Sequence, residues 1–201
     1  MEFVKKFSIF LHQNDIIKFG DYTLASGKKS SYYIDLRLVP SYPHQFRNMI
    51  KHLQNHIIEN TGLNDFDSLV SVPTGGLVIA SALAIEIVKP LIYVRNKPKN
   101  YGTVKSVEGK IQKGMRVVMI DDVATTGGSV VNAIKSLKDV NISIKDAYVV
   151  VDRMEGADEA LKKINVKLHS MINIVQITEE LHKQKLVGDT VLEKIMEQTR
   201  K

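Results

Sequence analysis

The 201-residue chain contains no cysteine. This absence excludes a disulfide framework, a thiolate zinc site and a cysteine nucleophile. Glycine and proline are few, at 12 and 5 residues, and hydrophobic residues make up 44% of the chain. This composition is typical of a folded globular protein rather than a disordered chain. A chain of this length is expected to form about one domain with its own core.

Long apolar runs are also lacking. The longest, over residues 77–85, contains Ser81 and is followed by Glu86, well short of the roughly 20 residues that span a bilayer. Near the first residue, two lysines precede a brief apolar patch, but the patch is too short for a secretory signal and no small-residue cleavage site follows it. We therefore expect a cytoplasmic protein with no membrane-spanning helix.

Basic residues outnumber acidic residues by 28 to 22, which gives a net charge of +6. Such a surplus can attract nucleic acid, an anionic membrane or a polyphosphate ligand. The lysines are scattered, however, so a plain solvated surface explains the charge equally well. The histidines include one close pair, His52 and His56, which lacks the intervening glutamate of a metalloprotease motif, and we expect no zinc site.

Short apolar segments alternate with longer segments of helical pattern. Strands are predicted at 68–72, 91–94, 116–120, 147–151 and, at an edge, 167–173; helices are predicted at 46–60, 77–88, 129–138, 158–163 and 189–197. Strands that are apolar at every position are buried on both faces, which predicts an α/β fold with a mostly parallel sheet flanked by helices.

The first 40 residues follow a different pattern. A helix is predicted over 4–14, and short strand segments over 22–39 surround a loop rich in serine, glycine and lysine. We expect these residues to form a small hood on a single domain that spans residues 1–201.

The most informative segment is 116–129, in which an apolar strand is followed by two carboxylates, a loop of small residues and a helix. Open parallel sheets bind ligands at the carboxyl ends of their strands. Paired glycines let the backbone approach an anion, and a helix start supplies free N–H groups. The segment therefore predicts a phosphate cradle whose carboxylates hold ribose hydroxyls, or Mg²⁺ through water. The predicted cradle consists of Asp121, Asp122, Val123, Ala124, Thr125, Thr126, Gly127, Gly128 and Ser129.

Two other interpretations of this segment are weaker. An apolar strand ending in two aspartates also occurs in nucleoside triphosphatases, but these need an upstream glycine-rich loop ending in Gly-Lys-Ser/Thr, which this chain lacks. A strand that simply ends in a turn would not need the whole combination of carboxylates, hydroxyls and glycines.

The segment resembles the motif with which the type I phosphoribosyltransferases bind phosphoribosyl pyrophosphate (PRPP). Residues 95–109 resemble the mobile catalytic loop of one branch, the orotate phosphoribosyltransferases, and residues 152–157 resemble its base-binding segment. The resemblance spans nearly the whole chain. It implies the type I phosphoribosyltransferase fold, and transfer of the 5-phosphoribosyl group from PRPP to orotate in de novo pyrimidine (UMP) biosynthesis, with release of pyrophosphate. It also implies a homodimer and Mg²⁺ held mainly by the substrate, with no metal ligated directly by the chain.

The resemblance assigns roles within the loop. It implies three catalytic residues, Lys99, Asp121 and Asp122, of which Lys99 is donated across the dimer interface. It also implies that Arg95, Lys99 and Tyr101 bind PRPP. A cluster of cations suits a site from which pyrophosphate leaves with several negative charges. An ordinary solvated loop could carry the same charges.

Orotate binding is implied for Thr125 and Arg153. The planar guanidinium of arginine suits the carboxylate of orotate in a way that lysine does not. The alternative for Arg153 is an ion pair with Asp152 or Glu155 at the surface.

The chain departs from the family pattern at several positions. Asn96 and Ala25 stand where lysine is common, although Lys28 and Lys29 lie near Ala25 in sequence. The pyrophosphate loop at 73–76 lacks the lysine that some relatives carry, so its backbone N–H groups are expected to contribute more. Tyr101 replaces a common histidine, which weakens a proton-transfer role because an ordinary tyrosine titrates near pH 10.

Two rival functions remain. One is a phosphoribosyltransferase for another base, and the other is a PRPP-sensing regulator of nucleic acid on the same fold. Lys99 favours the enzyme, because a sensor need not stabilise a leaving group. We therefore expect an enzyme whose partners are PRPP and orotate, not nucleic acid or a membrane.

Overall fold

The computed structural model describes residues 2–23, 27–95 and 106–200. Six strands form the larger sheet in the order β5-β4-β3-β6-β7-β8, in which every neighbouring pair is parallel except β4 and β5. These strands are β3 (Ser68–Ser71), β4 (Leu91–Val94), β5 (Val107–Glu108), β6 (Arg116–Ala124), β7 (Ser143–Asp152) and β8 (Lys167–Asn173).

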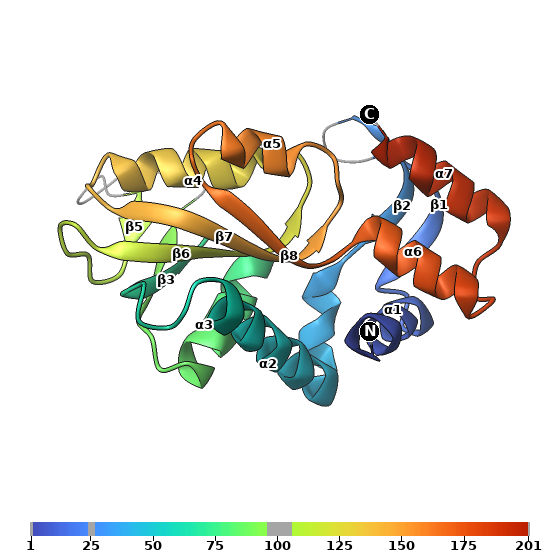
Figure 1. The fold of residues 1–201 in the computed structure, drawn as a ribbon, viewed down its shortest axis with the longest axis horizontal. Helices are drawn as coiled ribbons and strands as arrows, with labels where there is room; N and C mark the ends of the chain where they lie inside the picture. Colours follow the sequence, from blue (N-terminus) through green and yellow to red (C-terminus); the bar gives the residue numbers. More distant parts are fainter. Residues whose placement is uncertain (1, 24–26, 96–105, 201) are drawn as a thin grey trace.

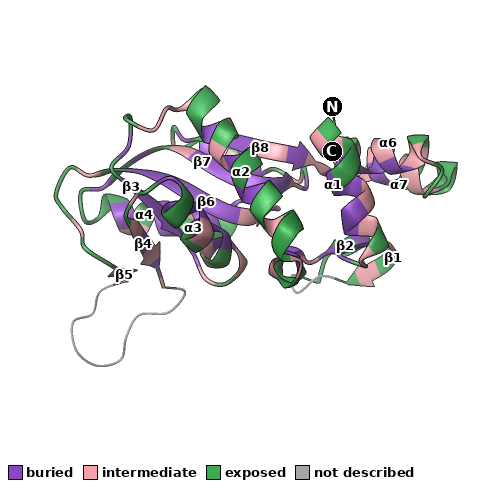
Figure 2. Cartoon of the chain, turned by 90° about the horizontal axis from the view of Figure 1, so that it is seen from below, coloured by how far each residue is buried: buried purple, intermediate pink, exposed green. Residues whose placement is uncertain are grey.

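Helices cover both faces of this sheet (Figure 1). One face carries α2 (Pro43–Asn60) and α3 (Gly75–Glu86), and the other carries α4 (Gly128–Lys138) and α5 (Ala157–Lys162). The strands of this sheet are largely buried, whereas the helices and loops carry most of the exposed residues (Figure 2). The predicted α/β fold with a mostly parallel sheet is confirmed.

Alternation along β6 divides the hydrophobic core into two clusters. Val118 and Ile120 belong to the cluster that includes α2 and α3, while Val117 and Met119 belong to the cluster that includes α4. All four side chains are at most 3% exposed. Successive strand side chains point to opposite faces, so an uninterrupted apolar strand is what a sheet covered on both faces requires.

A second, smaller unit lies beside the sheet (Figure 1). It contains the antiparallel pair β1 (Ile17–Thr23) and β2 (Lys29–Ile34), together with α1 (Glu2–Gln13), α6 (Ile174–Lys183) and α7 (Asp189–Thr199). We call this unit the hood. The short 3₁₀ helix η1 (Leu36–Ser41) leads from it to α2. Both ends of the described chain thus contribute to the hood, which the sequence had assigned to residues 1–40.

Helix α6 was not predicted from the sequence. A capping box begins it: Asn173 Oδ1 accepts a hydrogen bond of 2.8 Å from the Gln176 N–H, and Gln176 Oε1 accepts one of 2.9 Å from the Asn173 N–H. Ile174, Ile177 and Leu181 then form its buried face. Both the capping pair and this spacing are sequence signals of a helix.

Other predicted elements differ in their limits. The strand predicted to end at Ile120 continues to Ala124, so Asp121 and Asp122 lie within it. The reason is that β7 continues to pair with β6 over this stretch, up to Ala124 opposite Asp152. Residues 36–39, predicted as extended, belong to η1. No helix in the described ranges is long and apolar enough to cross a membrane.

Aromatic rings pack between α2 and the sheet. His169 stacks on Tyr148, with ring centroids 4.4 Å apart, and His56 meets both rings edge-on. His169 Nε2 lies 2.7 Å from Asp146 Oδ1, and the Tyr148 hydroxyl lies 2.6 Å from Thr61 Oγ1. Burial lowers the pKa of His56 below its usual value, and the neighbouring His169 acts in the same direction. The fold therefore favours the neutral form of His56.

This arrangement predicts a pH dependence of stability. Between the lowered pKa of His56 in the fold and about 6.5 in the unfolded chain, the unfolded chain binds more protons, so stability is lost as the pH falls. Urea unfolding from about pH 7 to pH 5 should show a slope that His56→Gln reduces, by at most about 1.4 kcal/mol per pH unit. His44→Gln is the control, because His44 is exposed near the start of the same helix. Equal slopes for the His56→Gln variant and the unsubstituted protein would contradict the prediction.

Candidate active site

Between the hood and the carboxyl ends of β6 and β7 lies a cavity of about 350 Å³. The sheet contributes Asp122, Thr125 and Arg153 to its lining, and the start of α3 contributes Gly75. We call this cavity the sheet-edge cavity. The structure therefore brings residues from both predicted binding segments to one place.

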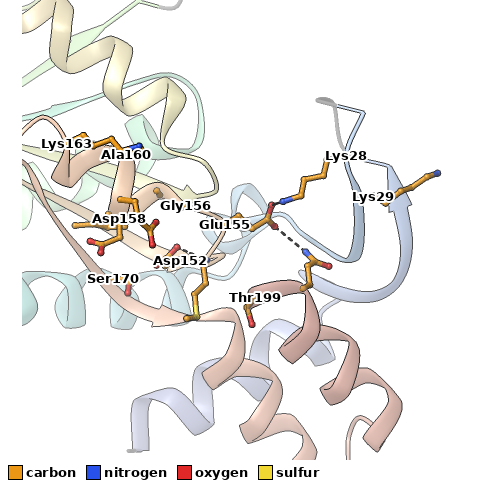
Figure 3. A pocket seen from close by; sticks show the side chains of 15 residues that line it. Lys28, Lys29, Asp152, Glu155, Gly156, Asp158, Ala160, Lys163, Ser170 and Thr199 are labelled. Carbon is orange, nitrogen blue, oxygen red and sulfur yellow. Dashed lines mark hydrogen bonds and ion pairs between the residues drawn. The ribbon is translucent and has the colours of Figure 1, made fainter. Parts of the chain in front are cut away.

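A larger cavity, of about 860 Å³, lies between α5, the start of β2 and α7 (Figure 3). Of the predicted site residues in the described ranges, none lines this cavity. Residues of the segment 152–157 other than Arg153 line it, so the base segment lies between the two cavities.

The two adjacent carboxylates have different environments. Asp121 is 6% exposed, and its Oδ1 accepts a hydrogen bond of 2.9 Å from the Asp122 N–H. Burial and the negative charge of Asp122 raise the pKa of Asp121 well above its usual value. Asp122 is less buried, lines the sheet-edge cavity and accepts a hydrogen bond of 2.9 Å from the Val123 N–H. Of the pair, Asp122 is the one placed to meet a ligand.

The start of α3 lies directly against these carboxylates. A Cβ atom added at Gly75 would overlap the carboxylate of Asp122, and one added at Gly76 would overlap Asp121. The close approach of α3 to β6 therefore requires glycine at both positions. The sequence had suggested residues 73–76 only as a backbone loop for pyrophosphate.

The predicted phosphate loop turns into α4. Gly127 has φ of +76° and precedes the first helical residue, and a Cβ atom there would lie 3.2 Å from the backbone of Ala157. Gly128 and Ser129 are exposed at the amino end of the helix. Free backbone N–H groups and the helix dipole at such an end favour an anion.

Arg153 is 5% exposed and held from several sides. Its guanidinium lies over the Tyr32 ring, 4.4 Å from the centroid, and Nη2 donates to Ser30 Oγ at 3.0 Å. Nε and Nη2 both contact Glu155 Oε1, at 3.0 and 2.9 Å. The ion pair with Glu155 considered from the sequence exists, but it is buried rather than at the surface. These contacts are made by Nε and Nη2, so Nη1 is the candidate donor for a ligand.

A second arginine in the cavity lining was missed in the sequence. Arg37 on η1 donates from Nε to Asp35 Oδ1 at 2.6 Å and from Nη2 to Asp35 Oδ2 at 2.8 Å. The hydrogen bonds from Arg37 hold the pKa of Asp35 below its usual value. Both residues line the sheet-edge cavity. The position of Arg37 and Asp35 at the cavity depends on how the hood packs against the sheet. No local sequence signal indicates this packing.

Val123 also lines this cavity, whereas Asp121, Ala124, residues 126–129 and Arg95 do not. Arg95 follows β4, two strands away from β6, and its Nη1 lies 3.1 Å from Glu108 Oε1. Lys99 and Tyr101, together with the departures Asn96 and Ala25, lie outside the described residues.

The sequence and fold match known proteins. The family model for the phosphoribosyl transferase domain matches residues 43–184. The orotate phosphoribosyltransferase of Cenarchaeum symbiosum (strain A) is 50% identical over 200 residues, covering 100% of both chains. The chain belongs to the orotate phosphoribosyltransferase family. The family resemblance inferred from the motifs is thereby confirmed, and the protein is a phosphoribosyltransferase enzyme.

Solved structures of the family share the fold. The orotate phosphoribosyltransferase from Aeropyrum pernix matches with a TM-score of 0.78 and 36% identity, covering 90% of this chain and 99% of that chain. Leishmania donovani UMP synthase matches with a TM-score of 0.84 and 29% identity. The match covers 98% of this chain but only 43% of the Leishmania protein, so this chain spans less than half of that longer protein.

The contact between Gly75 and Asp122 generates a prediction. Gly75→Ala should displace the Asp122 carboxylate from the sheet-edge cavity and weaken PRPP binding at least about tenfold, because hydrogen bonds to a charged group are lost. Titration calorimetry with PRPP measures the change. Gly188→Ala is the matched control, since a Cβ atom there meets nothing within 4 Å. Unchanged PRPP affinity in a folded Gly75→Ala protein would mean that Asp122 does not contact the substrate.

Proposed function

We propose that the sheet-edge cavity is the site at which the enzyme transfers the 5-phosphoribosyl group from PRPP to orotate, forming orotidine 5′-monophosphate and pyrophosphate in UMP biosynthesis. One observation carries this assignment. Asp122 and Thr125 from the phosphate segment line the same cavity as Arg153 from the base segment. The relatives in Cenarchaeum symbiosum and Aeropyrum pernix, both orotate phosphoribosyltransferases by name, support the choice of base.

PRPP binding is proposed for the segment that joins β6 to α4. The 5′-phosphate accepts hydrogen bonds from backbone N–H groups at residues 126–129 and from the hydroxyls of Thr126 and Ser129. Asp122, at the cavity wall, accepts hydrogen bonds from the ribose hydroxyls. Asp121 is buried behind it and supports this edge of the strand.

Orotate binding is proposed for Arg153 and Thr125. The Nη1 group of Arg153 donates to the orotate carboxylate, while Glu155 and Ser30 hold the rest of the guanidinium. A charge-assisted hydrogen bond of this kind is stronger than one between neutral groups. Uracil lacks this carboxylate, so the contact favours orotate over uracil.

The chemistry requires charge stabilisation more than a covalent nucleophile. As the bond from the anomeric carbon to pyrophosphate breaks, the departing oxygen takes the electron pair and the ribosyl centre becomes cationic, until N1 of orotate forms the new bond and releases its proton to solvent or to the departing pyrophosphate. Lys99, with Arg95 and Tyr101, is proposed to meet the charge that develops on pyrophosphate. The two substrates must be held in line for this step, which the shared cavity achieves.

Mg²⁺ is the proposed cofactor. Within the described residues, no group of three His, Cys, Asp or Glu side chains could hold a metal ion. Asp122 lines the cavity, and one or two carboxylates combined with substrate phosphates form a common setting for Mg²⁺. These residues therefore fit a metal held mainly by the substrate. When bound, it would offset the negative charge of the pyrophosphate group.

A homodimer is proposed, with Lys99 serving the partner's site. The dimer is supported by exposed apolar side chains on α3 and just after it. Val78, Ile85 and Val88 are 42%, 82% and 87% exposed. Large apolar side chains that are exposed in this way suit an interface between protein chains. Helix α3 begins at the sheet-edge cavity, so a second copy on this face would lie near the site. The cytoplasmic location expected from the sequence stays a prediction.

Base specificity is the first test of this proposal. With Mg²⁺ and PRPP, the protein should release pyrophosphate with orotate and much less with uracil, adenine or hypoxanthine. Arg153→Ala should lower kcat/KM for orotate by about 2 to 4 kcal/mol and leave PRPP affinity nearly unchanged, because it removes the partner of the carboxylate. Equal losses for both substrates would place Arg153 outside the base site. PRPP binding without turnover of any base would favour the sensor instead.

Mixing two inactive variants tests the shared site. Lys99→Ala and Asp122→Asn should each be nearly inactive, with defects on different halves of the site. Random re-pairing of equal amounts yields half heterodimers, each with one complete site, so activity should recover to roughly a quarter of the unsubstituted level. Mass spectrometry of differently tagged chains confirms the exchange. Activity that stays at the level of the parents after exchange would show that Lys99 does not act across the interface.

A further inference from the structure

Glu155 joins three parts of the structure through one buried carboxylate. Its side chain is 1% exposed, and its Oε2 lies 2.5 Å from Lys28 Nζ. Its Oε1 accepts hydrogen bonds from Arg153 and, at 3.3 Å, from Gln198 Nε2. Figure 3 shows Glu155 between Lys28 and the end of α7 that carries Thr199. The hood, the base segment and the carboxyl-terminal helix thus meet at this carboxylate.

The contacts fix the orientation of the Arg153 guanidinium. Nε and Nη2 both contact the same oxygen of Glu155, which orients the guanidinium plane within the site. The Tyr32 ring covers one face of the guanidinium. Nη2 also donates to Ser30, so Nη1 is the corner that stays available. A side chain held in this way loses little further rotamer entropy when a ligand binds. Rotation of Arg153 would break all of these contacts together.

Gln198 connects this carboxylate to the hood strand. Its Nε2 donates to Glu155, and its Oε1 accepts a hydrogen bond of 3.0 Å from the Ser31 N–H. Ser31 is the neighbour in β2 of Ser30 and Tyr32, the two hood residues that contact Arg153. Helix α7 therefore positions Glu155 and β2 relative to each other.

The net charge of Glu155, Arg153 and Lys28 also favours binding of an anion beside Arg153. Burial alone would raise the pKa of Glu155, but hydrogen bonds from Lys28 and the charge of Arg153 outweigh it, and the pKa lies below its usual value. Glu155 is therefore ionised at neutral pH, and its single negative charge is shared between two cations. The three groups carry one net positive charge, which an anionic base can neutralise.

We propose that Glu155, assisted by Gln198, is a positioning residue that sets Arg153 for the carboxylate of the base and thereby determines selectivity for orotate over uracil. This inference rests on the proposed function of the sheet-edge cavity. It assigns to the carboxyl-terminal helix a part in base recognition, although none of its residues lines that cavity in the described structure.

Steady-state kinetics of Glu155→Gln tests the inference. Glutamine keeps an oxygen that can accept from Arg153, but it removes the charge and presents an N–H₂ group to Lys28. The KM for orotate should rise about tenfold while kcat and the KM for PRPP change less than about twofold. The preference for orotate over uracil should fall by a similar factor. Glu155→Asp, which keeps the charge on a shorter side chain, should restore part of the loss.

Two further variants separate positioning from folding. Glu159→Gln is the matched control, because it makes the same change at an exposed residue that lines the larger cavity. Gln198→Ala should raise the KM for orotate by about threefold without a matching change in kcat, and its effect should not add to that of Glu155→Gln. Thermal unfolding of each variant shows whether it is folded. If Glu155→Gln does not fold, the kinetics of Gln198→Ala test the inference.

The outcomes are distinct. If the unsubstituted protein turns over orotate and Arg153→Ala impairs it, an unchanged orotate KM in Glu155→Gln would overturn the inference alone. Equal changes in kcat and in the KM of both substrates would also overturn it, because they indicate a general structural role. If the unsubstituted protein does not use orotate, the proposed function fails, and the inference fails with it.

Discussion

The parallel pairing of β6 with β7 is the constraint on which the active site depends. The ladder continues past the carboxylates to Ala124 and Asp152, and the Arg153 N–H donates to the Ala124 carbonyl at 2.9 Å. Because this register is fixed, the proposed phosphate loop leaves β6 where Arg153, the proposed base-binding residue, leaves β7. A shift of one residue would reverse which face each side chain occupies. Backbone hydrogen bonds therefore place the two proposed binding segments side by side, before any side chain contributes.

The hood completes the site from the other side. Neither end of the described chain forms it alone, since α1, β1 and β2 pack with α6 and α7. The contacts that matter are far apart in sequence: Arg153 with Ser30, and Gln198 with Ser31. Each joins a segment of the hood to a partner more than 100 residues away. These contacts let a cavity form between the hood and the sheet, and they connect α7 to Arg153 through Glu155.

The sequence predicted best what is local. The apolar run of β6, the glycines after it and the helix that follows were identified because strand burial and anion binding leave compositional signals over a few residues. The limits of β6 were wrong, because strand ends depend on the partner strand. The environment of Arg153 was only half predicted: Glu155 is two residues away and was named as a partner, whereas burial against Tyr32 requires the hood. Arg37 was missed for the same reason, since no local pattern indicates which side chains meet across a cavity.

Electrostatic balance links these features. A substrate such as PRPP brings many negative charges to a strand that already carries two carboxylates, so repulsion must be limited. The structure buries Asp121 against the start of α3, away from the cavity, and the helix dipole favours a negative charge there. Of the two adjacent carboxylates, only Asp122 lines the cavity, together with Asp35, Arg37 and Arg153. The same principle operates at Glu155, whose one charge is shared between Arg153 and Lys28. In both places a carboxylate is kept away from the substrate, so fewer negative charges face an anionic base and a polyphosphate.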